Sequence, residues 1–471
     1  MALRLSFKRF YPMNVTAPAE TIAAIATAPG QGGISIVRIS GPQSLAIADA
    51  VFRCRSPLPS QRAAFTFVPG HVVDAGGRAM DEALLLVFRA PHSFTREDVV
   101  EIQGHGGPAV TRQVLRRVLE AGARPAEPGE FTRRAFLNGR LDLVQAEAVL
   151  DLIRARTDRA ATAALDQLQG GLTHKITPLY EAILMLAANL EATLDFSDQD
   201  LPEGVLDGLS ERIAGQVISI ESVLASWNEG HLLRDGATVV IAGRPNVGKS
   251  TLLNALLGQE RAIVSEQPGT TRDTIEEDLV LEGIALNIVD TAGLRETACA
   301  IEQEGIRRTE DRLSRADLYI YVVDASQEID GEDIKRMASL DKARCLVLAN
   351  KQDLAPAVSP ALPFGYEVIE TSLKLGTGLD KLREALVRCL HAGSVQSVQH
   401  AAISERHRIL LASALGDVRE ARRMLADGKT GDPSLAAQAL REGVAALGQI
   451  IGRDYHEELL DSIFSRFCIG K

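Results

Sequence analysis

The sequence Gly243-Arg-Pro-Asn-Val-Gly248-Lys249-Ser250 matches the pattern GxxxxGK(S/T). It follows a short β-rich run at 238–242 and opens a stretch with helical spacing, which is the context of a phosphate-binding loop. Glycines let backbone N–H groups converge on phosphate oxygens, and the N-terminus of the helix adds positive potential. In such a loop Lys249 would bridge the β- and γ-phosphates and Ser250 would bind Mg²⁺. The alternative interpretation is a glycine-rich turn that happens to contain Lys and Ser.

Later motifs favour the phosphate-binding interpretation and indicate the base. Asp290-Thr-Ala-Gly293 ends the β-rich run at 285–289, where Asp290 can hold the water shell of Mg²⁺ and the Gly293 amide can contact the γ-phosphate. Asn350-Lys-Gln-Asp353 ends a later run, and its aspartate can accept hydrogen bonds from two guanine N–H donors that adenine lacks. Ser372-Leu-Lys374 stands where a final loop would contact the base. The sequence therefore predicts a GTP site at the carboxyl edge of an α/β sheet.

Hydrolysis of GTP needs a water molecule held in line and a cation or donor that neutralises charge. Ras-like proteins place Gln directly after the DxxG glycine, but this chain has Leu294 there. The loop 265–273 offers hydroxyls and carbonyls, with Thr271 positioned to complete the Mg²⁺ shell. Three downstream carboxylates are candidates for orienting the water, and the residues alone leave the choice open: Glu302, Glu304 and Glu310.

Composition places the chain among ordinary globular proteins. It has 471 residues, 46% apolar and 24% charged, and chains of this length divide into about three domains. The formal charge of -11 argues against sequence-independent coating of nucleic acid. The five cysteines have no CxxC spacing, so neither zinc nor disulfides are indicated and a reducing cytoplasm fits best. Apolar runs such as 318–323 are far shorter than the ~20 residues that span a bilayer.

The pattern along the chain predicts a multidomain α/β and α protein. Residues 1–20 are expected to be a disordered leader, with Met13 as an alternative start and a targeting signal as the disfavoured alternative. We expect an α+β domain at 21–137, with strands at 34–39 and 83–88. Apolar residues at helical spacing from Leu165 to Leu190 predict a long helix or helical hairpin, kinked at Pro178.

Between 236 and 390 short β-rich runs alternate with helical stretches, which predicts an inserted P-loop G domain with a mainly parallel sheet covered by helices on both faces. Helical spacing returns at 440–451 and 459–467. We expect these helices to pack on the earlier ones, so that 138–235 and 391–471 form one discontinuous helical domain.

Several further motifs make the chain resemble the tRNA wobble-uridine modification GTPases of the MnmE (TrmE) family, from Thr21 to the C-terminus. They are Ala28-Pro-Gly-Gln-Gly-Gly33, Gly104-His-Gly-Gly-Pro108, Pro128-Gly-Glu-Phe-Thr132, Arg134-Ala-Phe-Leu-Asn138, the Gly-Thr-Thr-Arg-Asp loop at 269–273, and Phe467-Cys-Ile-Gly-Lys471. The resemblance implies that the N-terminal domain is related to folate-binding aminomethyl-transfer domains, dimerises, and binds a 5-formyl-tetrahydrofolate-type donor.

The implied folate contacts are Arg38, Glu101, Arg140 and Lys471. Arg140 stands where the family often has Lys, and outside the resemblance these arginines would be surface charges. The terminal motif of the family points Cys468 into the folate pocket, where it is a candidate catalytic residue. By itself this cysteine would be a small buried hydrophobe, the usual place of a free thiol.

The resemblance also implies that K⁺ replaces an arginine finger. The matching K⁺ positions are Asn246, Ser265, Gln267 and Thr270, and the second and third depart from the commoner Thr and apolar residues. Glu302 matches the family's water-orienting glutamate. The full set of expected nucleotide and cation contacts is Asn246, Val247, Gly248, Lys249, Ser250, Thr251, Ser265, Gln267, Thr270, Thr271, Asp290, Thr291, Ala292, Gly293, Asn350, Lys351, Asp353, Ser372 and Lys374.

These observations predict a homodimeric, K⁺-dependent, cytoplasmic GTPase. With an FAD-containing partner subunit it would add an aminomethyl-type (5-carboxymethylaminomethyl) group to the wobble uridine of certain tRNAs, and hydrolysis would act as a conformational switch. One alternative is a ribosome-assembly GTPase that binds rRNA, which an RNA-binding module after the G domain would favour. Another is a membrane-remodelling GTPase, which would need a lipid-binding segment. Neither feature is evident in the sequence.

Overall fold

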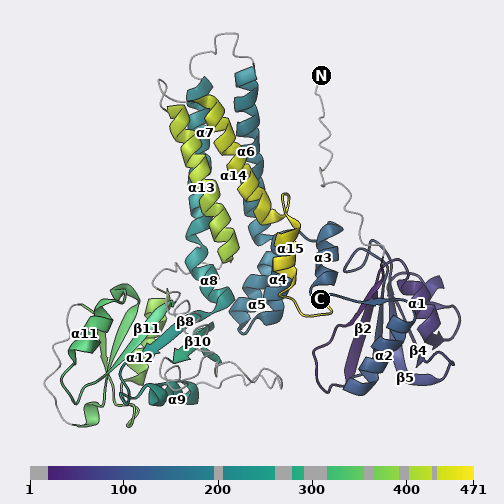
Figure 1. Cartoon of the computed structure of the whole chain (residues 1–471), viewed down its shortest axis with the longest axis horizontal. Helices are drawn as coiled ribbons and strands as arrows, with labels where there is room; N and C mark the ends of the chain where they lie inside the picture. The colour runs from purple at the N-terminus through teal and green to yellow at the C-terminus, as the bar shows by residue number, and fades with distance from the viewer. Residues whose placement is uncertain are drawn as a thin grey trace, which may run out of the picture. The chain divides into compact units, whose positions relative to one another are not determined.

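The computed structural model describes residues 20–195, 205–259, 278–290, 316–354, 365–391, 403–426 and 432–471. These residues form two compact units (Figure 1). The first comprises Met1–Leu150, Gln167–Glu221 and Ile409–Lys471, and the second comprises Asp151–Asp166 and Ser222–Arg408. The expected leader lies almost wholly outside the described residues, and the three-domain boundaries drawn from the sequence stay a prediction.

The first unit opens with a seven-stranded sheet in the order β3-β4-β5-β6-β2-β1-β7. Its neighbours are antiparallel except β1 and β7, which are parallel. The strands are β1 (Ile22–Ile25), β2 (Ile34–Ser40), β3 (Phe52–Cys54), β4 (Thr66–Val73), β5 (Ala79–Phe88), β6 (Val99–His105) and β7 (Arg124–Pro125). The helices α1 (Ser44–Val51) and α2 (Pro108–Glu120) share its apolar core. The expected strands at 34–39 and 83–88 lie within β2 and β5.

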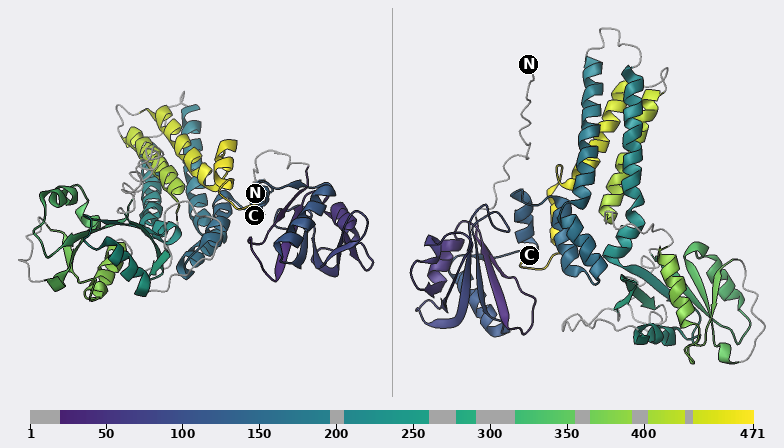
Figure 2. Two further views of the ribbon diagram at one scale, coloured as in Figure 1. Left: turned by 60° about the horizontal axis from the view of Figure 1, so that its bottom comes forward. Right: turned by 180° about the vertical axis from the view of Figure 1, so that it is seen from behind.

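A helical layer completes the first unit and leads into the second. In the first unit lie all or most of α3 (Glu130–Leu137), α4 (Leu143–Arg154), α6 (Gly171–Asp195), α7 (Val205–Ala225), α13 (Glu405–Ala426), α14 (Pro433–Ile451) and α15 (Glu457–Phe464), whereas α8 (Trp227–Asp235) and most of α5 (Asp158–Leu168) belong to the second unit. Helices α6, α7, α13 and α14 run side by side in every view (Figure 2). The apolar pattern from Leu165 to Leu190 divides between α5 and α6, because the chain turns at Gly170 with φ of 98°. Pro178 lies inside α6, which continues past it.

The second unit contains a six-stranded sheet in the order β13-β12-β11-β8-β10-β9. Its elements are β8 (Ala237–Ala242), α9 (Lys249–Gln259), β9 (Asp278–Leu281), β10 (Ile284–Asp290), β11 (Leu318–Asp324), α11 (Gly331–Ala338), β12 (Cys345–Asn350), β13 (Glu367–Glu370) and α12 (Leu379–His391). Every pairing is parallel except that of β9 with β10, as expected for a mainly parallel sheet. The β9–β10 hairpin turns at Glu282 and Gly283, whose φ angles of 50° and 80° suit a two-residue turn.

Helices cover both faces of this sheet. Alternate residues of a strand point to opposite sides, so β11 contributes side chains to two core clusters. Leu252 of α9 and Leu382 of α12 join one core cluster, together with Ile320 of β11. Met337 of α11 joins the other cluster, together with Tyr321. Within the described ranges, none of the helices has the length and apolar composition needed to cross a membrane.

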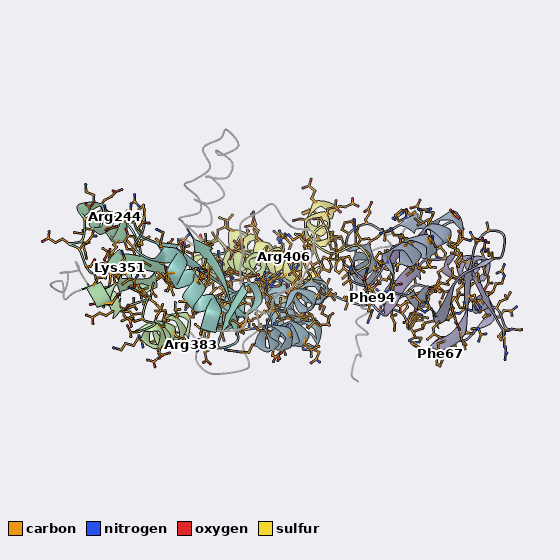
Figure 3. The ribbon with its side chains drawn as sticks, turned by 90° about the horizontal axis from the view of Figure 1, so that it is seen from below. Phe67, Phe94, Arg244, Lys351, Arg383 and Arg406 are labelled. Atoms are coloured by element: carbon orange, nitrogen blue, oxygen red, sulfur yellow. The ribbon has the colours of Figure 1, made fainter. Side chains whose placement is uncertain are left out.

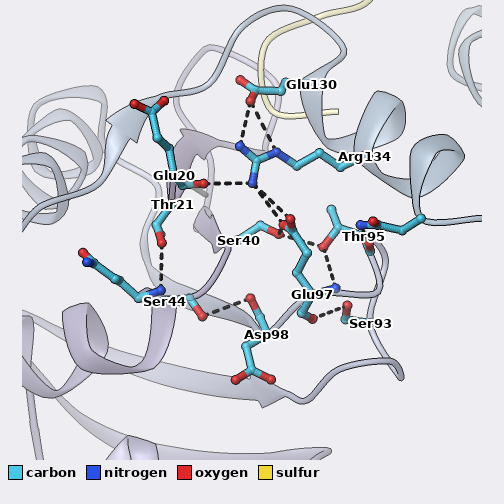
Figure 4. Close-up of polar contacts among 12 residues, drawn as sticks. Glu20, Thr21, Ser40, Ser44, Ser93, Thr95, Glu97, Asp98, Glu130 and Arg134 are labelled. Atoms are coloured by element: carbon cyan, nitrogen blue, oxygen red, sulfur yellow. Dashed lines mark hydrogen bonds and ion pairs between the residues drawn. The ribbon is translucent and has the colours of Figure 1, made fainter. Parts of the chain in front are cut away.

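A buried charge network fastens α3 to the N-terminal sheet (Figure 4). The side chain of Arg134 is 1% exposed, and it donates to Glu130 at 2.9 Å and to Glu97 at 3.2 Å. It also donates to the backbone oxygen of Glu20 at 3.0 Å. Arg124 makes a further ion pair with Glu130 at 2.6 Å. Every charge in this network has a partner, which compensates the desolvation cost of its burial. The same buried contacts join the sheet to the start of the helical layer.

Candidate functional site

The loop after β8 has the backbone shape that a phosphate site requires. Gly243, Asn246 and Gly248 have positive φ angles of 141°, 64° and 110°. A side chain at Gly243 would overlap the carbonyl oxygen of Val322, and one at Gly248 would overlap the amide nitrogen of Asn350. Both positions therefore need glycine. Asn246, an L-residue in the left-handed region, carries strain of about 1 kcal/mol, which is typical of functional loops.

Lys249 begins helix α9 and is 6% exposed. Its Nζ atom donates to the backbone oxygens of Gly243 at 3.0 Å and Arg244 at 2.6 Å, so the ammonium group lies on the loop that precedes it. Ser250 and Thr251 follow with exposed side chains in the first turn of the helix. A buried ammonium, a helix N-terminus and a close-packed glycine loop together fit a polyphosphate.

Asn350, at the end of β12, connects three parts of this edge. Its Nδ2 atom donates to the Val247 oxygen at 2.8 Å, and its Oδ1 atom accepts from the Leu373 backbone nitrogen at 3.0 Å. Asn350 is 4% exposed, so both bonds are shielded from water. The phosphate loop, the end of β12 and the Ser372-Leu-Lys374 loop are thus held together by one side chain.

The groups expected to choose the base lie beside this connection. Asp353 Oδ1 accepts a hydrogen bond of 2.6 Å from Ser372 Oγ. This bond lowers the pKa of the Asp353 carboxyl below its ordinary value, which keeps it an ionised acceptor for N–H donors. Lys351 adopts φ of 71° and its ammonium pairs with Asp324 at 2.6 Å (Lys351 is labelled in Figure 3). Burial raises the pKa of Asp324, but hydrogen bonds from Lys351 and Ser326 outweigh it and lower the pKa. Lys374 is exposed.

Asp290 is the last residue of β10 and pairs in register with Ile241 of β8, which brings its backbone next to the strand that leads into the phosphate loop. The other expected contacts lie outside the described residues: Ser265, Gln267, Thr270, Thr271, Thr291, Ala292, Gly293 and Glu302, as well as the alternatives Glu304 and Glu310.

A second group of expected site residues gathers in the first unit. Arg38 of β2 and Glu101 of β6 stand opposite each other in the antiparallel ladder, and their side chains form an ion pair at 2.8 Å. An Nη1 atom of Arg38 also donates to the backbone oxygen of Gly470 at 3.5 Å, so the C-terminus reaches this sheet. Lys471 follows directly. Residues more than 400 positions apart thus meet at one place.

Arg140 lies on the aromatic ring of Phe94, with its Cζ atom 4.7 Å from the ring centroid, and Arg38 lies 5.7 Å from the same centroid. The sequence reasoning missed Phe94, because a phenylalanine in a loop has no pattern that marks it as the meeting point of two arginines. Cys468 is exposed rather than buried, and its backbone oxygen accepts a hydrogen bond of 3.5 Å from Gly129. It is therefore not the small core residue that a free thiol usually is.

A parallel sheet with this edge defines a P-loop protein that binds a guanine nucleotide. Two family models match the chain: the MnmE helical domain over residues 143–468, and the GTP-binding protein TrmE N-terminus over residues 21–140. The chain belongs to the MnmE family of tRNA modification GTPases, and its enzyme class is GTP hydrolase.

Similar proteins span nearly the whole chain. The tRNA modification GTPase MnmE of Geobacter sulfurreducens is 44% identical over 96% of this chain and 99% of its own length. That of Moorella thermoacetica is 46% identical over the same shares. Among solved structures, the G domain of the FeoB iron transporter of T. maritima is 28% identical over 32% of this chain and 98% of its own, with a TM-score of 0.25. At that score the likeness adds nothing to the fold described above.

Proposed function

We propose that the chain is a K⁺-dependent GTPase that, with an FAD-containing partner subunit, adds a 5-carboxymethylaminomethyl-type group to the wobble uridine of certain tRNAs. The observation that carries this proposal is family membership combined with the nucleotide edge, where Asn350 holds the phosphate loop and the base loop together. The protein would work as a cytoplasmic homodimer. Hydrolysis then supplies a conformational signal and not the transferred carbon.

GTP would lie along the carboxyl edge of the sheet. Lys249 would hold the β- and γ-phosphates, Ser250 and Thr271 would bind Mg²⁺, and Asp353 would accept hydrogen bonds from two guanine N–H groups. Asn246, with its strained backbone, is the one expected K⁺ contact among the described residues. Asn246 and the residues at 265, 267 and 270 would hold the cation, which would supply positive charge for the transition state. Glu302 orients the attacking water, a role that the apolar Leu294 lacks the atoms to perform.

A 5-formyl-tetrahydrofolate-type donor would bind in the first unit. The proposed contacts are Arg38, Glu101, Arg140 and Lys471, with Cys468 as a candidate catalytic residue. The support is geometric: Arg38 pairs with Glu101, bonds the backbone just before Lys471, and shares the Phe94 ring with Arg140. The exposed thiol of Cys468 lies two residues before the carbonyl that Arg38 contacts.

Mass spectrometry of wobble nucleosides tests the function as a whole. A strain that lacks this gene should lose the modified uridine, and the wild-type gene should restore it. A Lys249→Ala copy should not restore it, whereas a copy with Lys381→Ala, an exposed lysine of α12 outside the proposed nucleotide contacts, should restore it. Normal modification in the deletion strain would overturn the proposal.

The cation requirement is tested separately with purified protein. GTP turnover should fall sharply when Na⁺ replaces K⁺ at matched ionic strength, because the smaller cation fits the same oxygens poorly. Equal turnover in the two salts would exclude K⁺ as the element that replaces an arginine finger, and would leave the tRNA function standing.

A further inference from the structure

Arg96 has an unusual backbone for its residue type. It lies in the loop between β5 and β6 with φ of 60° and an exposed side chain. An L-residue in this left-handed region is uncommon, and the conformation costs about 1 kcal/mol. Such strain persists where the side chain has a use. The guanidinium of Arg96 donates to the backbone oxygen of Asn138 at 2.9 Å.

Arg140 makes the reciprocal contact. Its guanidinium donates to the backbone oxygen of Phe94 at 2.8 Å, while it lies on the ring of the same residue. Two loops, 94–96 and 138–140, therefore exchange guanidinium–carbonyl hydrogen bonds. This exchange holds the two cationic groups on adjacent loops. Each guanidinium has five N–H donors, so most of them stay available to a ligand.

The charge of this arginine pair is not compensated within the described part of the chain. Arg38, which shares the Phe94 ring with Arg140, pairs with Glu101, but neither Arg96 nor Arg140 forms an ion pair with a described carboxylate. Partial burial lowers the pKa of Arg140, and the positive charges of Arg96 and Arg38 lower it further. In a chain with a formal charge of -11, two converging and repelling arginines indicate a site for an anion.

We propose that Arg96 and Arg140 bind the carboxylates of the glutamate tail of the folate-type donor, and so determine its selection in the polyglutamylated form. This inference rests on the folate part of the proposed function. A glutamate tail presents carboxylates on a flexible chain, and planar guanidinium groups bind carboxylates through paired hydrogen bonds. Arg140 shares the Phe94 ring with Arg38, which forms the ion pair with Glu101, so tail and pterin would bind side by side.

Arg96→Gly is the informative variant. Glycine adopts the positive φ without strain, so the variant keeps the backbone shape of the loop while it loses the charge and the hydrogen bond to Asn138, and binding of the tail-free pterin reports any displacement of the loops. Binding to the full-length protein is measured by calorimetry with three probes: 5-formyl-tetrahydrofolate, its pentaglutamate, and 5-formyl-tetrahydropterin, which has no tail. Arg96→Gly should weaken the pentaglutamate about tenfold, the scale of one hydrogen bond to a charged group, and should leave the tail-free pterin unchanged. Arg96→Lys should recover part of the loss.

Arg78→Gly is the matched control. It removes an exposed arginine from another turn of the same sheet, so all three affinities should stay at the wild-type level. Equal pentaglutamate affinity in Arg96→Gly and the wild type would overturn the tail assignment. If Arg96→Gly weakens an anticodon stem-loop RNA but not the pentaglutamate, the anion is an RNA phosphate and the inference is wrong. If the wild type binds none of the three probes, the folate part of the proposed function itself fails.

Discussion

The nucleotide edge and the arginine-rich side of the first unit position their residues by different means. At the nucleotide edge a neutral amide, Asn350, joins backbone groups of two loops, and glycines allow the close approach. In the first unit the buried guanidinium of Arg134 joins Glu130, Glu97 and the backbone of Glu20. Neutral hydrogen bonds have a modest desolvation cost. Buried charges have a large one, and are stable only while every partner is present.

Removal of one side chain should therefore cost more stability in the charged network around Arg134 than in the neutral hydrogen bonds of Asn350. The stability of the two units should also depend on pH in opposite directions. Buried carboxylates contribute to the stability of the first unit, whereas a histidine contributes to that of the second unit.

Arg134→Met should have the largest effect. It leaves the carboxylates of Glu130 and Glu97 buried with one partner fewer, and loss of one partner of a buried pair costs about 3–5 kcal/mol. Amide hydrogen exchange of β1 and β2 should report this loss directly. Arg133→Met is the control, because Arg133 pairs with the exposed Glu457 and Asp461 and should cost less than about 1 kcal/mol. Equal protection in the two variants would show that the network is not stabilising.

Acid should destabilise the first unit through Glu130. Burial raises the pKa of this carboxyl, but hydrogen bonds from Arg124, the Glu127 amide and Arg134 outweigh it and bring the pKa to about 2, from an ordinary 4.5. A lowered folded pKa gives stability that is complete above about pH 4.5 and is lost as the pH falls toward 2, about 3 kcal/mol in all. Glu130→Gln should flatten this part of the pH–stability curve. An unchanged curve would remove Glu130 as its source.

Asn350→Ala should destabilise the nucleotide edge by about 2–3 kcal/mol, because the Val247 carbonyl and the Leu373 N–H are left buried without a hydrogen-bond partner. GTP affinity should fall about a hundredfold, since the phosphate loop and the base loop are no longer held together. Asn287→Ala is the control. This half-buried asparagine of β10 forms hydrogen bonds with Arg156 and with the backbone of Asp235, away from the nucleotide loops. Equal GTP affinities in the two variants would contradict the role of Asn350.

Alkali should destabilise the second unit through His231. This histidine of α8 lies 3.1 Å from Asp235 and 3.6 Å from Asp317, and these carboxylates raise its pKa to about 9. A raised folded pKa gives stability that is complete below about pH 6.5 and is lost as the pH rises through 9, about 2 kcal/mol after allowance for partial exposure. His231→Asn should abolish the alkaline decline in the melting temperature. A persistent decline would assign it to another group.

Asp353→Asn should have the smallest effect, which is on the affinity for GTP. An amide can accept only part of what the carboxylate accepts from guanine, so GTP affinity should fall about tenfold while xanthosine triphosphate begins to bind. Titration of both nucleotides measures the exchange. A variant with wild-type GTP affinity would place Asp353 outside the site. The protein fold should be unaffected, because this carboxylate is at the surface.

The sequence determined the nucleotide edge well because its parts are contiguous. The loop from Gly243 to Ser250 and the motif that ends in Asp353 each contain their geometry within a few residues, so a local pattern predicts both. The mainly parallel sheet follows from the same alternation of strands and helices. The sequence did not indicate that Asn350 would hold two other loops, and it left open whether the helical pattern is one long helix or divides, as it does at Gly170.

The proposed folate contacts of the first unit are brought together only by the tertiary structure. Arg38, Phe94, Arg140 and Gly470 meet only because an antiparallel sheet and the returning C-terminus bring them together, and no spacing along the chain records that meeting. The network around Arg134 is of the same kind. Local motifs determine local backbone shape, whereas compensation of a buried or crowded charge depends on neighbours that are far away in the chain. For that reason the pair Arg96 and Arg140, which has no carboxylate partner among the described residues, became visible only in the folded protein.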